Sequence, residues 1–165
     1  MKSRAKNSQL QIRVSEPQKR AIRNAAKRAG LHMSEYVLSR VLSIPTQRFQ
    51  QILEELSVTP SPSFALAALH DLLSALSASE LREAIASHPE APLSAYLSNY
   101  VAAMIETVCA ARTVPVPAWA RSVAPLSEPI FGSELKSLRL HLLTQSPPAF
   151  RRRNLFVDAT IGSRV

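Results

Sequence analysis

Residues 8–43 read SQLQIRVSEPQKRAIRNAAKRAGLHMSEYVLSRVLS, and this stretch carries the clearest pattern in the chain. Near its start, three apolar residues alternate with three polar ones. The apolar residues are Leu10, Ile12 and Val14, and the polar residues are Gln9, Gln11 and Arg13. Because successive side chains of a strand point to opposite faces, this alternation predicts a β-strand with one apolar and one polar face.

The residues after the strand predict a helix over 16–29. Ser15 and Gln18 have the spacing of a capping box, in which each side chain bonds the other residue's backbone N–H. Pro17 suits the first turn of a helix, where its missing N–H costs no hydrogen bond. Gly30 is expected to end this helix in a left-handed conformation.

A second helix is predicted over 35–43, after a short turn. Ser34 is expected to cap its first turn, and Pro45 to prevent its continuation. A strand and two short helices are too small to bury a core alone, and a single strand leaves its backbone groups unpaired. Two copies remove both difficulties, because their strands can pair antiparallel while four helices cover the apolar faces. We therefore predict an obligate homodimer in which folding and association are one event.

This segment resembles the ribbon-helix-helix family of DNA-binding domains, and most closely the group found in bacterial antitoxins and small repressors. Four features carry the resemblance: the alternating Leu-Gln-Ile-Arg-Val strand, the Ser-Glu-Pro opening, the Ala-Lys-Arg-Ala-Gly-Leu turn, and the Met-Ser-Glu-Tyr-Val start of the second helix. The resemblance covers residues 8–43. It implies that the paired strands enter the major groove of double-stranded DNA and read base edges.

The resemblance implies two sets of DNA contacts. Base reading falls to the polar face of the strand, which holds Gln9, Gln11 and Arg13. This agrees with their chemistry, since glutamine pairs in two-pronged fashion with adenine and arginine with guanine. The expected phosphate contacts are Lys2, Arg4, Lys6, Ser34 and Glu35, from a basic arm and from the start of the second helix. The alternative is that Ser34 only caps the helix and that Glu35 is a first-turn acid favoured by the helix dipole.

The charge distribution separates this segment from the rest of the chain. The whole chain of 165 residues has a formal net charge of +8. Residues 1–45 contribute +8, residues 46–112 contribute −4 and residues 113–165 contribute +4. A basic head followed by an acidic middle indicates a polyanion-binding module joined to a region with another task.

The remaining sequence predicts three parts. Residues 46–63 are expected to form a helix followed by a linker rich in proline and serine. Residues 64–112 predict a small antiparallel bundle, with helices over 64–76, 79–87 and 93–112. Residues 113–165 predict an extended, Pro-rich, partner-binding tail with one short helix over 134–144. The fold class is therefore mainly α, with a ribbon-helix-helix domain over 1–45 followed by a helical bundle and an extended segment.

The predicted tail is the candidate site for a protein partner. Four prolines between residues 115 and 129 prevent a long helix or a central strand. Aromatic residues and arginine are favoured anchors at protein interfaces. The expected contacts are Trp119, Phe131, Phe150, Arg151, Arg152 and Arg153. Two alternatives stay open: the aromatic side chains pack on this chain's own bundle, or the three arginines bind further phosphates.

Several function classes are not supported by the sequence. The chain has only three glycines and lacks a phosphate-binding Gly-rich motif. Cys109 is the single cysteine and is expected to be a buried small hydrophobe, and the four histidines lack metal-ligand spacing. We expect no enzyme, no catalytic residues, no cofactor and no metal. No secretory signal and no long apolar stretch is present, so we expect no membrane partner and a cytoplasmic location.

The leading functional hypothesis is a DNA-binding antitoxin of a type II toxin–antitoxin system. Its N-terminal dimer would repress its own operon, and its C-terminal region would neutralise a protein toxin. Its partners would be an operator DNA, a second copy of the chain, further dimers along the DNA, and the cognate toxin. The main alternative is a ribbon-helix-helix transcriptional regulator whose C-terminal region oligomerises or senses a ligand. A third hypothesis is a plasmid partition or relaxation accessory protein.

Overall fold

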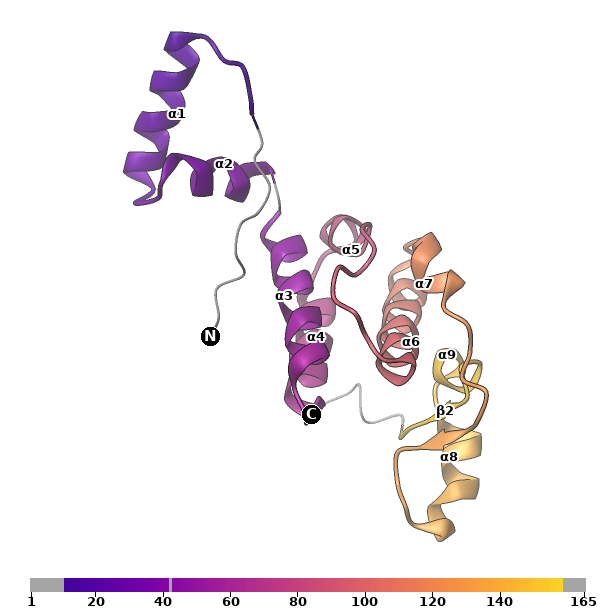
Figure 1. Cartoon of the computed structure of the whole chain (residues 1–165). Coiled ribbons are helices and arrows are strands. Elements are labelled where there is room, and N and C mark those ends of the chain that lie inside the picture. The colour runs from indigo at the N-terminus through magenta and orange to yellow at the C-terminus, as the bar shows by residue number, and fades with distance from the viewer. Residues whose placement is uncertain (1–10, 42, 159–165) are drawn as a thin grey trace. The chain divides into compact units, whose positions relative to one another are not determined.

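The structure is a computed structural model that describes residues 11–41 and 43–158. The chain divides into two compact units, Met1–Leu42 and Ser43–Val165, here called the N-terminal unit and the C-terminal unit (Figure 1). The division lies three residues before the end of the predicted DNA-binding domain at residue 45. It also lies well before the predicted linker at 58–63, which is not a boundary between units.

The N-terminal unit contains the helices α1 (Glu16–Arg28) and α2 (Met33–Val41), which contact each other and run in different directions (Figure 1). The predicted capping box of α1 is confirmed. The Ser15 N–H donates to Oε1 of Gln18 at 2.9 Å, and the Ser15 hydroxyl accepts from the Gln18 N–H at 3.5 Å. Gly30 has a φ of 69°, the left-handed conformation predicted after this helix.

Helix α2 begins earlier than predicted. It starts at Met33, so Ser34 lies within its first turn and is not its cap. The backbone N–H of His32 donates to Oε2 of Glu35 at 3.2 Å, which brings a carboxylate to the start of the helix. Glu35 is the third residue of the helix, the position from which an acidic side chain reaches back to the N–H of the residue before the helix.

The predicted strand is not formed in the single chain. Residues 11–15 belong to neither a helix nor a strand, while Gln9 and Leu10 lie outside the described residues. Ile12 is 58% exposed and Val14 is 41% exposed. A strand needs a partner for its backbone groups, and no described residue of this chain provides one for this segment. The paired strands of a dimer therefore stay a prediction.

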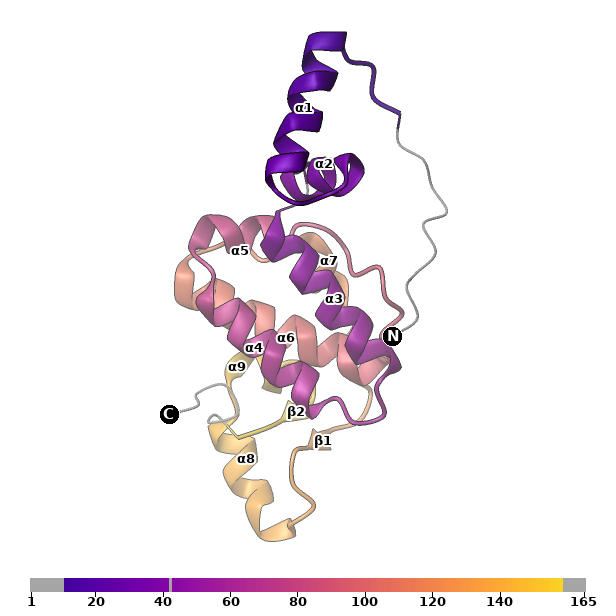
Figure 2. The ribbon, with the colours of Figure 1, turned by 90° about the vertical axis from the view of Figure 1, so that its left-hand side faces the viewer.

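The C-terminal unit begins with four helices in a compact arrangement (Figure 2). They are α3 (Ile44–Val58), α4 (Ser63–Ala75), α5 (Ala78–Ala84) and α6 (Ala95–Arg112). Helix α3 contacts α4 and α5, and α4 contacts α6. Ser43, Ser77 and Ser94 cap α3, α5 and α6 by accepting a backbone N–H with their hydroxyl groups. The bundle predicted over 64–112 is therefore present, with α3 added to it.

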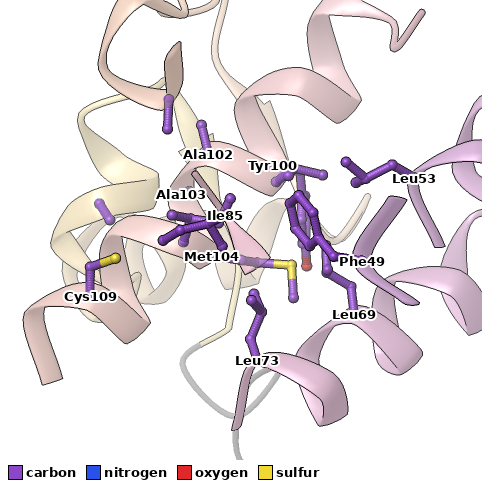
Figure 3. Close-up of a cluster of buried hydrophobic side chains, with 14 of the residues drawn as sticks. Phe49, Leu53, Leu69, Leu73, Ile85, Tyr100, Ala102, Ala103, Met104 and Cys109 are labelled. Carbon is purple, nitrogen blue, oxygen red and sulfur yellow. The ribbon is translucent and has the colours of Figure 1, made fainter. Parts of the chain in front are cut away.

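The core of this unit explains why α3 belongs to it. Phe49 and Leu53 of α3 lie close to Leu69 of α4 and to Tyr100 of α6 (Figure 3). The four inward residues of α3, which are Phe49, Ile52, Leu53 and Leu56, are at most 1% exposed. Complete burial of an α3 face requires α4 and α5 as its cover. The segment at 58–63 is thus a tight connection inside one core.

The predicted extended tail is instead an integral part of the C-terminal unit. Helices α7 (Ala118–Ser122) and α9 (Pro148–Arg151) both contact α6. The strands β1 (Ile130–Phe131) and β2 (Leu155–Phe156) pair in parallel, with Ile130 opposite Leu155. Val114, Ala120, Ala149, Phe150, Leu155 and Val157 join the buried core. The prediction of an extended tail is wrong because these apolar side chains find cover within the chain, and partner binding by this segment stays a prediction.

The last predicted helix, over 134–144, is also shifted. A 3₁₀ turn, η1 (Lys136–Leu138), leads into α8 (Arg139–Gln145), which ends one residue later than predicted. The Ser133 hydroxyl accepts from the N–H of Leu135 at 3.2 Å, so this serine closes a local turn and does not start an α-helix.

Candidate nucleic-acid interface

The N-terminal unit presents a strongly basic surface along α1. Its exposed cations are Lys19, Arg20, Arg23, Lys27 and Arg28, with Arg13 just before the helix. The described acids of this unit are Glu16 and Glu35 alone, and Glu16 lies 3.8 Å from the Lys19 ammonium group. Such an excess of exposed positive charge attracts a polyanion, and this attraction weakens as salt is added.

The predicted base-reading residues are accessible where the structure describes them. Gln11 and Arg13 are exposed. Gln9, Lys2, Arg4 and Lys6 lie outside the described residues. Gln11 and Arg13 are thus open to a ligand, and their arrangement on a paired strand stays a prediction.

At the predicted phosphate site, the start of α2, the structure places the carboxylate of Glu35. Ser34 and Glu35 are both exposed in the first turn. The Glu35 carboxylate accepts the His32 N–H, so it already carries negative charge at the helix start. This contact agrees with the alternative interpretation of Glu35 as a first-turn acid. A phosphate bound there would be repelled by the nearby Glu35 carboxylate.

An apolar surface accompanies the basic one. Within the described part of the N-terminal unit, Ala26 is the only buried residue. Six larger apolar side chains are exposed: Ile12, Val14, Leu31, Met33, Leu38 and Val41. So many exposed apolar side chains on a small unit indicate an interaction surface.

The predicted partner-binding arginines of the C-terminal unit fall into two groups. Arg153 is 4% exposed, and its Nη2 lies 2.5 Å from Oε1 of Glu106. Its guanidinium group also donates to Oδ1 of Asn99 at 3.2 Å and to the Ala120 carbonyl at 2.7 Å. Arg151 and Arg152 are exposed, and Nη2 of Arg152 lies 3.5 Å from Oε2 of Glu106. Arg153 therefore organises the interior of this chain and is not available to a toxin.

The predicted aromatic anchors also pack within the chain. Nε1 of Trp119 donates to the carbonyl of Ile85 at 2.9 Å. The buried Phe150 ring lies edge-on to Tyr100, with ring centroids 5.1 Å apart. Phe131 stacks on Phe156 at 5.0 Å. These contacts confirm the alternative that the aromatic side chains pack on the chain's own C-terminal unit.

The cluster of Asn99, Glu106 and Arg153 is the main feature that sequence reasoning missed. Asn99 and Glu106 lie on α6, and Arg153 follows α9. Glu106 is a lone acid in the apolar stretch Met104–Val108, which is the one signal that could have pointed to a buried cation. The partner itself is 47 residues away, so its identity depends on the fold.

Two titratable groups on α6 have raised pKa values. Burial, aided by the neighbouring Tyr96, raises the pKa of Tyr100 to about 12. Burial, and secondarily the charge of Glu106, raises the pKa of the Cys109 thiol. A raised pKa leaves the thiol protonated and unreactive, and Cys109 is fully buried. The expectation that Cys109 is a buried small hydrophobe is therefore confirmed.

Residues 11–41 and 43–158 contain no group of three or more histidine, cysteine, aspartate or glutamate side chains placed to hold a metal ion. Within the same ranges, no helix has the length and apolar character needed to cross a membrane.

The comparisons with known proteins yield one match. Residues 4–58 match the family model described as NikA-like, Mobilization protein NikA. The match spans about a third of the chain and ends with the last residue of α3. No curated protein matches this chain, and no solved structure does. The family match supports a ribbon-helix-helix, DNA-binding interpretation of the N-terminal segment and lends no support to the antitoxin group.

Proposed function

We propose that the chain is a DNA-binding, non-catalytic homodimer of the ribbon-helix-helix type that serves in DNA mobilization. The observation that carries this proposal is the match of residues 4–58 to a mobilization-protein family, located on the basic N-terminal unit. Among the hypotheses drawn from the sequence, it corresponds to the plasmid relaxation accessory protein. Because its ligand is DNA, the protein acts in the cytoplasm.

The charge and the exposed polar residues support DNA as the ligand. Lysine and arginine side chains along α1 are exposed, and described acids are few in this unit. Arg13 and Gln11 are exposed just before α1, where a strand paired across a dimer would present them to base edges. Sequence choice would come from this strand, and the basic side chains would add affinity without sequence choice.

The exposed apolar side chains support a dimer. Ile12 and Val14 share one face of the predicted strand, and Leu38 and Val41 are exposed on α2. A second copy would bury these apolar side chains. Pairing of the two strands would at the same time give their backbone groups hydrogen-bond partners. DNA binding and dimer formation would therefore be inseparable.

The narrower hypothesis of an antitoxin has less support. Of its expected toxin contacts, Phe150 and Arg153 are buried and Trp119 packs against Ile85. Phe131, Arg151 and Arg152 are the members of that set that keep some exposure. No comparison favours a toxin partner, so neutralisation of a toxin is a subordinate hypothesis that the experiments below separate from mobilization.

DNA recognition is tested by selecting duplexes from a random pool with the full chain. Arg13→Ala is expected to weaken binding of the selected duplex by about tenfold to a hundredfold, because each two-pronged base contact contributes about 1–3 kcal/mol. Binding to unrelated DNA should persist. Arg82→Ala is the matched control, since Arg82 is an exposed arginine on α5 in the other unit. If Arg13→Ala keeps the selected preference, the strand assignment is wrong.

The role in mobilization is tested by transfer of the DNA element that encodes the chain. Donor cells lacking the protein should transfer the element much less often, and wild-type or Arg82→Ala protein should restore transfer. Arg13→Ala protein should not. Unimpaired transfer without the chain would exclude the mobilization role. If a neighbouring reading frame were then toxic alone and harmless with the full chain, the antitoxin hypothesis would replace it.

A further inference from the structure

A cleft on the C-terminal unit is lined by both apolar and charged residues. It has a volume of about 430 Å³ and is bordered by α6, α7, the segments that follow them and the residues after α9. Its apolar lining, here called the apolar wall, includes Val114, Val116 and Val123. Its charged lining, here called the charged wall, consists of Glu106, Arg121, Arg152 and Arg153. The volume lies within the range of about 300–1,000 Å³ found for small-molecule sites.

The charged wall has more positive than negative groups. Glu106 is its only acid, and its two carboxylate oxygens contact Arg152 at 3.5 Å and Arg153 at 2.5 Å. Arg121 is exposed and forms no ion pair with any residue in the described part of the chain. Arg121 and the 72%-exposed side chain of Arg152 are therefore both able to approach an anion in the cleft.

Arg153 provides a second observation at the same place. Its Nε is the one buried side-chain nitrogen or oxygen of the described residues that has no hydrogen-bond partner. A buried donor without a partner is costly, and native structures leave few of them. Because this Nε is buried, an oxyanion in the cleft would meet the exposed guanidinium groups of Arg121 and Arg152 instead.

We propose that this cleft binds a small amphipathic carboxylate. Its head group would be held by Arg121 and Arg152, and its short aliphatic body would contact Val114, Val116 and Val123. A single negative charge suits the cleft better than two, because Glu106 is nearby and its repulsion grows with the charge of the ligand. All of these residues belong to the C-terminal unit, so the site is separate from the DNA-binding segment.

The chain carries its own reporter for this site. Trp119 is the single tryptophan and lies on α7, two residues before Arg121. The full chain is titrated with hexanoate while Trp119 fluorescence and the heat of binding are recorded, at constant ionic strength. We expect a dissociation constant of about 1 mM or tighter. Hexanol, acetate and inorganic phosphate should each bind at least about tenfold more weakly, since each lacks the head group or the apolar body.

Arginine variants locate the binding. Arg121→Gln and Arg152→Gln should each weaken hexanoate binding by about tenfold, because each removes a charge-assisted hydrogen bond. Arg151→Gln is the matched control, since Arg151 is exposed on the same short helix as Phe150 but does not line the cleft. All three variants should bind DNA as the wild type does, which distinguishes a failure here from a failure of the proposed function.

Three results would overturn the proposal. Hexanoate could produce no signal at about 10 mM, a concentration well above the expected dissociation constant. Acetate or phosphate could bind as tightly as hexanoate, which would show that the apolar wall contributes nothing. The double variant Arg121→Gln/Arg152→Gln could bind hexanoate unchanged. Binding of an acidic peptide without binding of hexanoate would assign the cleft to a protein partner and would equally refute the proposal.

Discussion

The N-terminal unit buries a single side chain among its described residues, that of Ala26, whereas the C-terminal unit buries a continuous core. Ile12 and Val41 of the first unit are more than half exposed. Phe49 and Leu69 of the second unit are fully buried. Both units begin a helix with a capping box, so local helix signals do not separate them.

The difference lies in where each unit finds cover for its apolar face. The C-terminal unit has enough chain to cover α3, α4 and α6 with one another and with the returning segment through β2. The N-terminal unit has two helices and a short preceding segment, which is too little for a core. The second unit is stabilised from within, and the first is expected to be stabilised by the association proposed above.

The largest expected effect is on association. Ile12→Lys places a charge on the apolar face of the predicted strand and should abolish the dimer and DNA binding, because the charge would be buried between two chains. Gln11→Lys, on the opposite face, should leave the dimer intact. Sedimentation of the full chain measures both. A dimeric Ile12→Lys protein would show that the apolar face of the strand is not the interface. The contrast between a unit stabilised by association and a unit stabilised by its own core would then be wrong.

The next largest effect concerns the core of the C-terminal unit. Phe49→Ala should lower the free energy of unfolding of this unit by about 3–5 kcal/mol, since a fully buried ring is replaced by a cavity. Phe64→Ala is the control, because the Phe64 ring is 89% exposed. Urea denaturation followed by Trp119 fluorescence reports this unit alone. Equal losses in the two variants would contradict the assignment of the core.

A smaller effect is expected at the buried ion pair. Glu106→Gln removes the partner of Arg153 and leaves a buried guanidinium charge, which should cost about 3 kcal/mol. Glu55→Gln is the control, since Glu55 and Arg48 form a pair at 4.0 Å with both side chains about half exposed. Such a surface pair contributes about 0–1 kcal/mol. The same urea titration measures both variants. An unchanged free energy of unfolding in Glu106→Gln would show that the Arg153 charge is stabilised without Glu106.

The smallest effect uses the two capping boxes. Hydrogen bonds from Ser77 lower the pKa of Glu80 below its usual 4.5. A lowered pKa in the folded state stabilises the fold above pH 4.5, and this contribution is lost as the pH falls through the lowered value. The destabilisation caused by Ser77→Ala should therefore shrink in acid. Ser15→Ala should show no such change, because its partner Gln18 does not titrate. Thermal melts at neutral and acidic pH measure both, and equal pH dependence would refute this distinction.

Local rules were sufficient for most helix positions. Ser15 with Gln18 and Ser77 with Glu80 signal helix starts within four residues, so no distant contact is needed. The start of α2 lies two residues before the predicted one, where Glu35 accepts the His32 N–H. The paired strand stays a prediction, because its predicted partner is another copy of the chain.

The amino-acid sequence alone determined the start of α1, the basic N-terminal segment and the alternating pattern of residues 9–14, because caps, charge and periodicity act over a few residues. The sequence left the Pro-rich region from residue 113 ambiguous. Its apolar side chains need to be buried, but the sequence does not show whether this chain or a partner buries them. Only the tertiary structure decided that Phe150, Leu155 and Val157 are buried on α6 and its neighbours, and that Arg153 pairs with Glu106. The physical reason is that burial depends on side chains far apart in the sequence, which no local pattern specifies.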